Sequence, residues 1–151
     1  MKSRTGFAIC VANCPVIWSS KLQGDIATST MEAEYSALSS AMRDLLPLRE
    51  LLISLSPSIT VNGQHPATFR TTVHEDNTGA WSLANLEPGR FTPRSKHYAV
   101  KLHWFRSKLV SDGSHPIKVV QISTDLQRAD ILTKGLTKIK FRVIRKQLYG
   151  W

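Results

Sequence analysis

Three carboxylates lie on or beside helices and strands that the surrounding sequence predicts: Glu34, Asp76 and Asp130. Glu34 precedes Leu38 by four residues, which places it on the apolar side of an expected helix. A carboxylate that faces a core costs several kcal/mol of folding free energy unless it is paired with a positive charge or bound to a metal. Asp76 lies between an expected strand and a short helix, a boundary that often presents binding or catalytic side chains. Asp130 has apolar neighbours on a third element.

Hard oxygen ligands of this kind suit Mg²⁺. Two such ions can hold the attacking and leaving oxygens of a phosphodiester, but this chemistry needs roughly four converging carboxylates, and we identify three. Structural roles are the alternatives. Glu34 can complement the dipole of the helix as a first-turn acid, and Asp76 can cap the helix that follows it.

The distribution of charge indicates a polyanionic partner. The chain has 151 residues, with 20 Lys and Arg against 11 Asp and Glu, a net charge of +9. Residues 1–87 carry a net charge of −2, whereas residues 88–151 carry +11. This asymmetry favours nucleic acid over a membrane surface, and a basic domain without such a partner is the alternative. No apolar run approaches ~18 residues, so we expect no membrane span.

The elements that must position the three acids read as a mixed α/β fold in one domain, residues 2–149. A capping box at Ser29 and Glu32 begins a long helix, which Pro47 is expected to kink or split. The other expected elements are an antiparallel hairpin (6–12 and 16–21), a strand (68–74), a short helix around Leu83, a helix (95–110), a strand (116–122), a helix (129–132) that Asp125 could cap, and a basic amphipathic tail.

Cys10 and Cys14 are too few for a disulfide scaffold and lack a second pair of ligands at zinc-site spacing. We therefore expect two buried thiols in the hairpin and, from them, a reducing compartment.

Five segments together carry a resemblance to a known family: 18–21 (WSSK), 29–38 (STMEAEYSAL), 75–77 (EDN), 94–98 (RSKHY) and 127–134 (QRADILTK). In this order they strongly resemble the ribonuclease H domain at the C-terminal end of copia-type retrotransposon polyproteins, from about residue 4 to residue 148. The resemblance implies a ribonuclease H-like mixed sheet with flanking helices. It also implies metal-dependent hydrolysis of the RNA strand of RNA–DNA hybrids, beside the reverse transcriptase portion of the same polyprotein.

Carried over by motif, Glu34, Asp76 and Asp130 are the catalytic and metal-binding residues of a two-ion Mg²⁺ site, with Mn²⁺ possible. The family's first aspartate lies on a strand before the stretch that matches residues 2–6, so this chain lacks it. That strand is central in the family. The resemblance therefore predicts either a gap in the sheet or direct pairing of 6–12 with 68–74, and weak or no activity from this fragment.

A non-catalytic nucleic-acid-binding remnant of the same fold is the alternative function, and a gene fragment that never folds stably is another. For hybrid binding, the expected surface lies on the helix 95–110 and the loop before it: Arg94, Lys96, His97, Lys101, Trp104 and Lys108. Trp104 covering the edge of the core is the structural alternative, and the tail bases are an alternative surface. The resemblance implies an intracellular protein, cytoplasmic and within a virus-like particle in the complete element.

Overall fold

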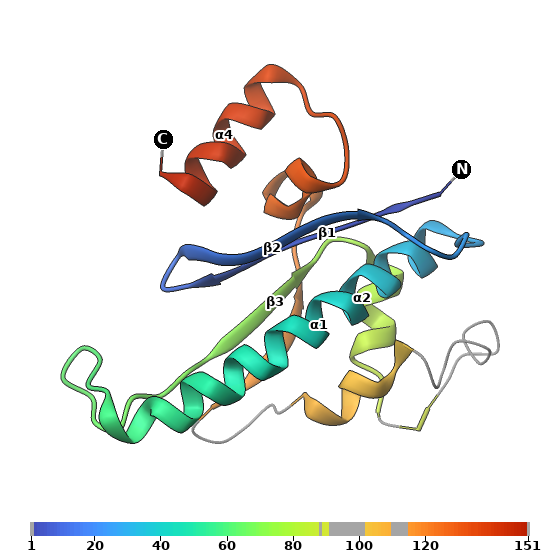
Figure 1. The fold of residues 1–151 in the computed structure, drawn as a ribbon. Helices are drawn as coiled ribbons and strands as arrows, with labels where there is room; N and C mark the ends of the chain where they lie inside the picture. The colour runs from blue at the N-terminus through green and yellow to red at the C-terminus, as the bar shows by residue number, and fades with distance from the viewer. Residues whose placement is uncertain (1, 88, 91–101, 110–114, 151) are drawn as a thin grey trace.

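A computed structural model describes residues 2–87, 89–90, 102–109 and 115–150 (Figure 1). The described part is a mixed α/β fold, as the sequence predicts. Its strands and α-helices are β1 (Arg4–Val11), β2 (Cys14–Leu22), α1 (Thr30–Leu55), β3 (Thr71–Glu75), α2 (Thr78–Ala84), β4 (Ile117–Gln121) and α4 (Lys138–Tyr149). Short 3₁₀ helices connect them: η1 (Ser56–Ser58), η3 (Trp104–Lys108), η4 (Thr124–Leu126) and η5 (Arg128–Leu132).

The first two strands form the expected antiparallel hairpin, with a bulge between Ile9 and Cys10. Phe7 and Ile9 are buried, whereas Ala8 between them is half-buried. The expectation of buried thiols is wrong, because Cys10 and Cys14 are both exposed. Cys14 directly follows the two-residue turn of the hairpin and Cys10 lies two residues before that turn, so both are near its tip.

The long helix α1 begins at the predicted capping box. The backbone N–H of Glu32 donates to Ser29 Oγ at 3.1 Å, and the Glu32 carboxylate accepts from both N–H and O–H of Thr28 at 2.7 Å. The helix is 26 residues long and continues through Pro47, so the proline does not split it. Packing of the apolar face against the rest of the fold outweighs the hydrogen bond that the proline removes.

The main core lies between α1, α2 and the parallel pair β3–β4. β3 and β4 pair in register from Thr71 with Ile117 to Glu75 with Gln121. The most deeply buried large side chains of this core are Tyr35, Met42, Phe105 and Ile117. Burying such side chains is the main favourable contribution to folding, so this core holds β3 and α1 at a set distance.

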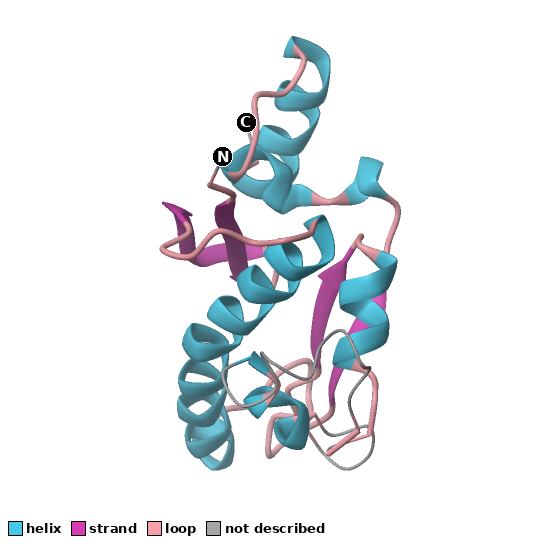
Figure 2. Cartoon of the chain, turned by 90° about the vertical axis from the view of Figure 1, so that its right-hand side faces the viewer, coloured by secondary structure: helices cyan, strands magenta, loops and turns pink. Residues whose placement is uncertain are grey.

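The two strand pairs stay separate. β1–β2 forms one two-stranded sheet and β3–β4 forms another, and in the described part of the chain no ladder joins them. Figure 2 shows the two pairs as distinct groups of strands. Of the two arrangements expected for a sheet without its central strand, the structure therefore has the gap and not the direct pairing.

Half of the segment expected to be a helix at 95–110, residues 95–101 and 110, falls outside the described residues. Its described end, η3, is a 3₁₀ helix rather than an α-helix. Phe105 and Arg106 are both buried. Arg106 donates to three backbone carbonyls, those of Leu83, Glu87 and Arg90, so side-chain anchoring shapes this segment.

The C-terminal part has the expected strand and amphipathic tail. Two 3₁₀ helices replace the single helix expected at 129–132, and they are capped by Ser123 and Gln127 rather than by Asp125. α4 buries Ile144 and Leu148 and leaves its other faces exposed. Among the described residues, no helix has the length and apolar character needed to cross a membrane.

Candidate functional site

A groove of about 580 Å³ runs through the gap between the two strand pairs. β1 forms one wall and β3 the other, while α1 forms the floor. Residues 126–130 and 133 close it at one end of the walls. The floor is apolar over most of its length, lined by Ala37, Leu38, Ala41, Leu45, Leu48 and Leu52. Leu38 marks the apolar side that the sequence predicts for this helix, so part of that side faces the groove.

The wall formed by β1 presents backbone groups to the groove. The N–H of Gln23 donates to the C=O of Ser3 at 2.9 Å, which marks this as a hydrogen-bonded pair of the antiparallel ladder. Hydrogen-bonded pairs recur at every second residue, so the N–H and C=O groups of Gly6 and Ala8 point away from β2. No other strand of the described chain pairs with that edge.

The wall formed by β3 also presents unpaired-edge backbone groups to the groove. Thr71 and Glu75 use their backbone groups toward β4, through Thr71 N–H to Pro116 C=O and Ile122 N–H to Glu75 C=O. The alternate residues, Thr72 and His74, therefore direct theirs toward the groove. A side chain already uses one of them, since Gln127 Nε2 donates to the C=O of His74 at 3.3 Å.

All three predicted acids, Glu34, Asp76 and Asp130, line the groove. Asp76 follows β3 and is half-buried, and its Oδ1 accepts from Gln127 Nε2 at 3.4 Å. The capping role that was the alternative for Asp76 belongs to its neighbour, because Asn77 Oδ1 accepts the N–H of Ala80. Asp76 is therefore not needed to start α2.

Glu34 lies in the second turn of α1 and lines the groove, as its spacing from Leu38 predicts. It is exposed at the surface of the groove rather than buried in a core. The surrounding protein still reduces its contact with solvent, and this desolvation is the first cause of its raised pKa. The carboxylates of Asp76 and Asp130 raise the pKa of Glu34 further and the ammonium of Lys134 lowers it, so three neighbouring charges act on this carboxylate.

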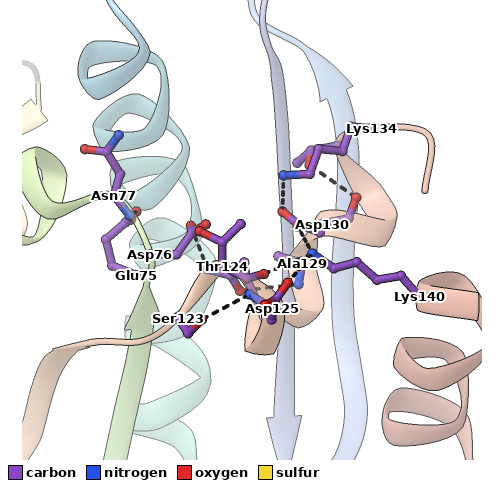
Figure 3. Close-up of polar contacts among 12 residues, drawn as sticks. Glu75, Asp76, Asn77, Ser123, Thr124, Asp125, Ala129, Asp130, Lys134 and Lys140 are labelled. Atoms are coloured by element: carbon purple, nitrogen blue, oxygen red, sulfur yellow. Dashed lines mark hydrogen bonds and ion pairs between the residues drawn. The ribbon is translucent and has the colours of Figure 1, made fainter. Parts of the chain in front are cut away.

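Asp130 also lines the groove and is 5% exposed, with ammonium groups on both carboxylate oxygens (Figure 3). Lys134 Nζ lies 2.9 Å from Oδ1. Lys140 Nζ, from α4, lies 3.1 Å from Oδ2. Sequence reasoning counted Lys140 only among the tail bases of the alternative nucleic-acid surface and did not pair either lysine with Asp130, although Lys134 follows Asp130 by four residues, a spacing at which helical side chains meet.

Glu75 is an acid of the site that sequence reasoning passed over. It is 5% exposed and its Oε1 accepts the N–H of Asn77 at 2.9 Å. Burial raises its pKa to about 7, and the charges of Glu34 and Asp76 act in the same direction, while hydrogen bonds from Asn77 and Asp76 oppose the rise. Its place beside Asp76 at the end of a strand was the available signal.

The donor types match Mg²⁺, but their arrangement does not fit a metal centre in this chain. Within residues 2–87, 89–90, 102–109 and 115–150, no three His, Cys, Asp or Glu side chains lie close enough to hold one ion. Asp130 is already engaged by two ammonium groups. We therefore derive no catalytic step through a metal for this chain.

The expected nucleic-acid surface is described only in part. Arg94, Lys96, His97 and Lys101 lie outside the described residues. Lys108 is exposed. Trp104 is half-buried, and its Nε1 donates to Ser39 Oγ on α1 at 3.0 Å, which ties its ring to the edge of the core.

The exposed bases of α4 form the alternative basic surface. Lys138, Arg142 and Lys146 are exposed, and three exposed apolar side chains lie among them: Ile139, Phe141 and Val143. This mixture of charge and apolar area suits a phosphate backbone with adjoining sugars and bases.

Comparison with known proteins identifies homologues in plant transposons. The chain is 34% identical to the retrovirus-related Pol polyprotein from transposon TNT 1-94 of Nicotiana tabacum over 149 residues, which is 99% of this chain and 10% of that protein. It is 30% identical over 146 residues to the corresponding polyprotein from transposon RE2 of Arabidopsis thaliana, covering 97% of this chain and 9% of the relative. For transposon RE1 of the same plant, the identity is 31% over 140 residues, 93% of this chain and 9% of the relative.

The chain thus spans about a tenth of the length of the curated relatives it matches. These relatives confirm the expected relation to retrotransposon polyproteins. No family model matches the chain, and no solved structure matches it.

Proposed function

We propose that this chain is part of the ribonuclease H domain of a retrotransposon polyprotein, the domain that hydrolyses the RNA strand of an RNA–DNA hybrid during reverse transcription. The observation that carries the proposal is the convergence of Glu34, Asp76 and Asp130, each from a separate motif, on one groove. Homology to retrovirus-related Pol polyproteins over nearly the whole chain supports it.

The proposal assigns metal binding to the complete domain rather than to this chain. Mg²⁺, or Mn²⁺ in its place, would supply charge stabilisation and a hydroxide nucleophile there. Glu34, Asp76 and Asp130 are the proposed ligands, together with the aspartate of the family's first strand. The gap between the two strand pairs supports the assignment of metal binding to the complete domain, because it leaves room for the family's first strand. β1 and β3, on either side of the gap, run in roughly opposite directions (Figure 1). One strand in the gap could then pair antiparallel with β1 and parallel with β3.

Residues 1–151 alone are expected to show little or no hydrolysis. The donor set is incomplete, and in the described part of the chain no three acid, histidine or cysteine side chains lie close enough to hold one ion, so developing charge at the phosphate is not stabilised. The measurement is Mg²⁺-dependent cleavage of a hybrid with a labelled RNA strand. Robust turnover by this chain that Asp76→Asn abolishes would contradict the prediction.

The partners follow from the same proposal. They are an RNA–DNA hybrid, held by the basic half of the chain, and the reverse transcriptase portion of the same polyprotein. The site of action is intracellular, in a virus-like particle of the complete element. A non-catalytic nucleic-acid-binding remnant is the second candidate, because the exposed bases of α4 do not depend on the incomplete acid set.

Hybrid binding should weaken steeply with salt. If the basic half neutralises about three to four phosphates, the affinity falls roughly 40- to 150-fold between 50 and 200 mM salt. Fluorescence anisotropy of a labelled hybrid measures this. The double variant Lys138→Gln/Arg142→Gln should lower the slope of log affinity against log salt by about 2.

Lys21→Gln is the matched control, since Lys21 is an exposed base in the near-neutral half of the chain. It should leave the slope unchanged. A flat salt response of the parent protein would count against both candidate functions.

A further inference from the structure

A buried arginine lies at the end of the groove that is far from the acids. Arg49 comes from the floor helix α1, lines the groove and is 8% exposed. Its guanidinium donates to Thr71 Oγ1 at 3.4 Å and to the C=O of His115. Thr71 is the first residue of β3, whereas Asp76 follows the last one. Arg49 therefore places a positive charge at the opposite end of β3 from the acids.

The charge of Arg49 is not balanced within the described chain. Both of its acceptors are neutral oxygens, and none of the carboxylates that the structure describes forms an ion pair with it. Burial lowers the pKa of this guanidinium. A buried charge is costly unless an opposite charge pairs with it, and a guanidinium has five N–H groups to donate. An anionic group in this end of the groove would therefore be stabilised.

The walls of the groove favour an extended polypeptide as the carrier of that anionic group. They direct backbone N–H and C=O groups inward, at Gly6 and Ala8 on β1 and at Thr72 on β3, and no strand of the described chain pairs with them. Open edges of this kind bind extended peptides through main-chain hydrogen bonds. The apolar floor between the walls can receive the side chains on one face of such a strand.

We propose that the groove binds an extended peptide supplied as a separate chain, parallel to β3, with a carboxylate side chain near the beginning of the peptide paired with Arg49. The inference deepens the proposed function and rests on its assignment of the gap to a single strand. The direction follows from the neighbouring pairs. A strand parallel to β3 is antiparallel to β1, so it extends the parallel pairing of β3–β4 and the antiparallel pairing of β1–β2. Its first residues then lie beside Thr71 and Arg49.

Peptide binding to residues 1–151 tests the proposal by fluorescence anisotropy, in EDTA so that no divalent ion takes part. The probe is a labelled peptide of about nine residues, the length of a typical strand, with alternating Val and Thr and with Glu near its beginning. One comparison peptide has Gln in place of Glu, and another has the Glu near its end. The first peptide should bind about tenfold more tightly than either, because a hydrogen bond between charged partners is stronger than a neutral one.

Variants of the protein assign this preference to one side chain. Arg49→Gln should remove the preference for the Glu peptide and leave the affinity for the Gln peptide unchanged. Arg43→Gln is the matched control, because Arg43 is an exposed arginine on the same helix and does not line the groove. It should keep the preference. The comparison of peptides on the parent chain does not depend on how well a variant folds.

Main-chain pairing is tested on the peptide itself. N-methylation of alternate residues should weaken binding of the Glu peptide about tenfold or more, because it removes backbone donors and blocks the approach of an edge. Undiminished binding of the N-methylated peptide overturns the proposal. Equal binding of the Glu and Gln peptides by the parent chain, or no binding of any peptide, also overturns it. Arg49-dependent binding of an RNA–DNA hybrid without peptide binding would assign the anion to a phosphate and likewise overturn it.

None of these measurements uses RNA cleavage. Absence of hydrolysis by a complete domain would refute the proposed function and leave the peptide comparison to be judged by itself. Conversely, cleavage by the complete domain together with equal binding of the Glu and Gln peptides would refute only the pairing with Arg49.

Discussion

Extended upstream to include the strand that the ribonuclease H family carries first, the protein should cleave the RNA of a hybrid about a thousandfold or more faster than residues 1–151 alone. Under the proposed function, the added strand would supply a fourth carboxylate, which two-ion chemistry requires. It would also fill the groove between β1 and β3, whose edges offer the backbone groups of Gly6, Ala8, Thr72 and His74. Losing even one preorganised group that stabilises transition-state charge costs roughly 10²–10³ in rate.

The measurement compares initial rates of Mg²⁺-dependent cleavage for the two lengths of chain on the same labelled hybrid. In the extended protein, Asp76→Asn should abolish cleavage. Asp44→Asn, an exposed acid on α1, is the control and should keep the rate. Equal and low rates for both lengths would favour the non-catalytic remnant over the enzyme.

Replacing Glu75 with glutamine should change how stability depends on pH. In the folded chain the pKa of Glu75 is raised to about 7, above its ordinary value of 4.5. The folded state therefore holds this proton more tightly than the unfolded state. The resulting stability is complete below pH 4.5 and is lost as the pH rises through 7. Relative to Glu75→Gln, the parent should lose on the order of 2–3 kcal/mol across that window.

Urea unfolding of both proteins at pH 5, 6, 7 and 8 measures the effect as a difference in unfolding free energy. The amide of glutamine keeps an oxygen that can accept the N–H of Asn77, so the comparison isolates the ionisation. Glu50→Gln, on the exposed side of α1, controls for the loss of one carboxyl group. A difference between Glu75→Gln and the parent that stays constant over this range of pH refutes the prediction.

Local patterns predicted the elements whose cause lies in neighbouring residues. The capping box at Ser29 and Glu32 marks the start of α1 because its hydrogen bonds join residues three apart. The apolar run at 6–12 and the turn residues that follow it predicted the β1–β2 hairpin, because strands and tight turns also depend on neighbouring residues. The thiols of Cys10 and Cys14 were misplaced because burial depends on what covers the tip of a hairpin, which short-range pattern does not contain.

Contacts between distant segments decided the rest. Trp104 is held by Ser39, 65 residues earlier, and Arg106 by the carbonyl of Leu83 on α2, so contacts with distant segments hold these two side chains in place. Lys140 reaches Asp130 only because α4 folds back onto the loop that precedes it. No spacing in the sequence encodes either contact.

For this protein, the sequence by itself determined the mixed α/β class, the relation to retrotransposon polyproteins and the three acids that face one groove. Those features depend on residue type and on short-range periodicity. Only the tertiary structure decided that β1 and β3 leave a gap, that Glu75 is buried beside the acids, and that two lysines occupy Asp130. Burial and charge pairing are properties of segments brought together by packing, so they exist only once the chain is folded.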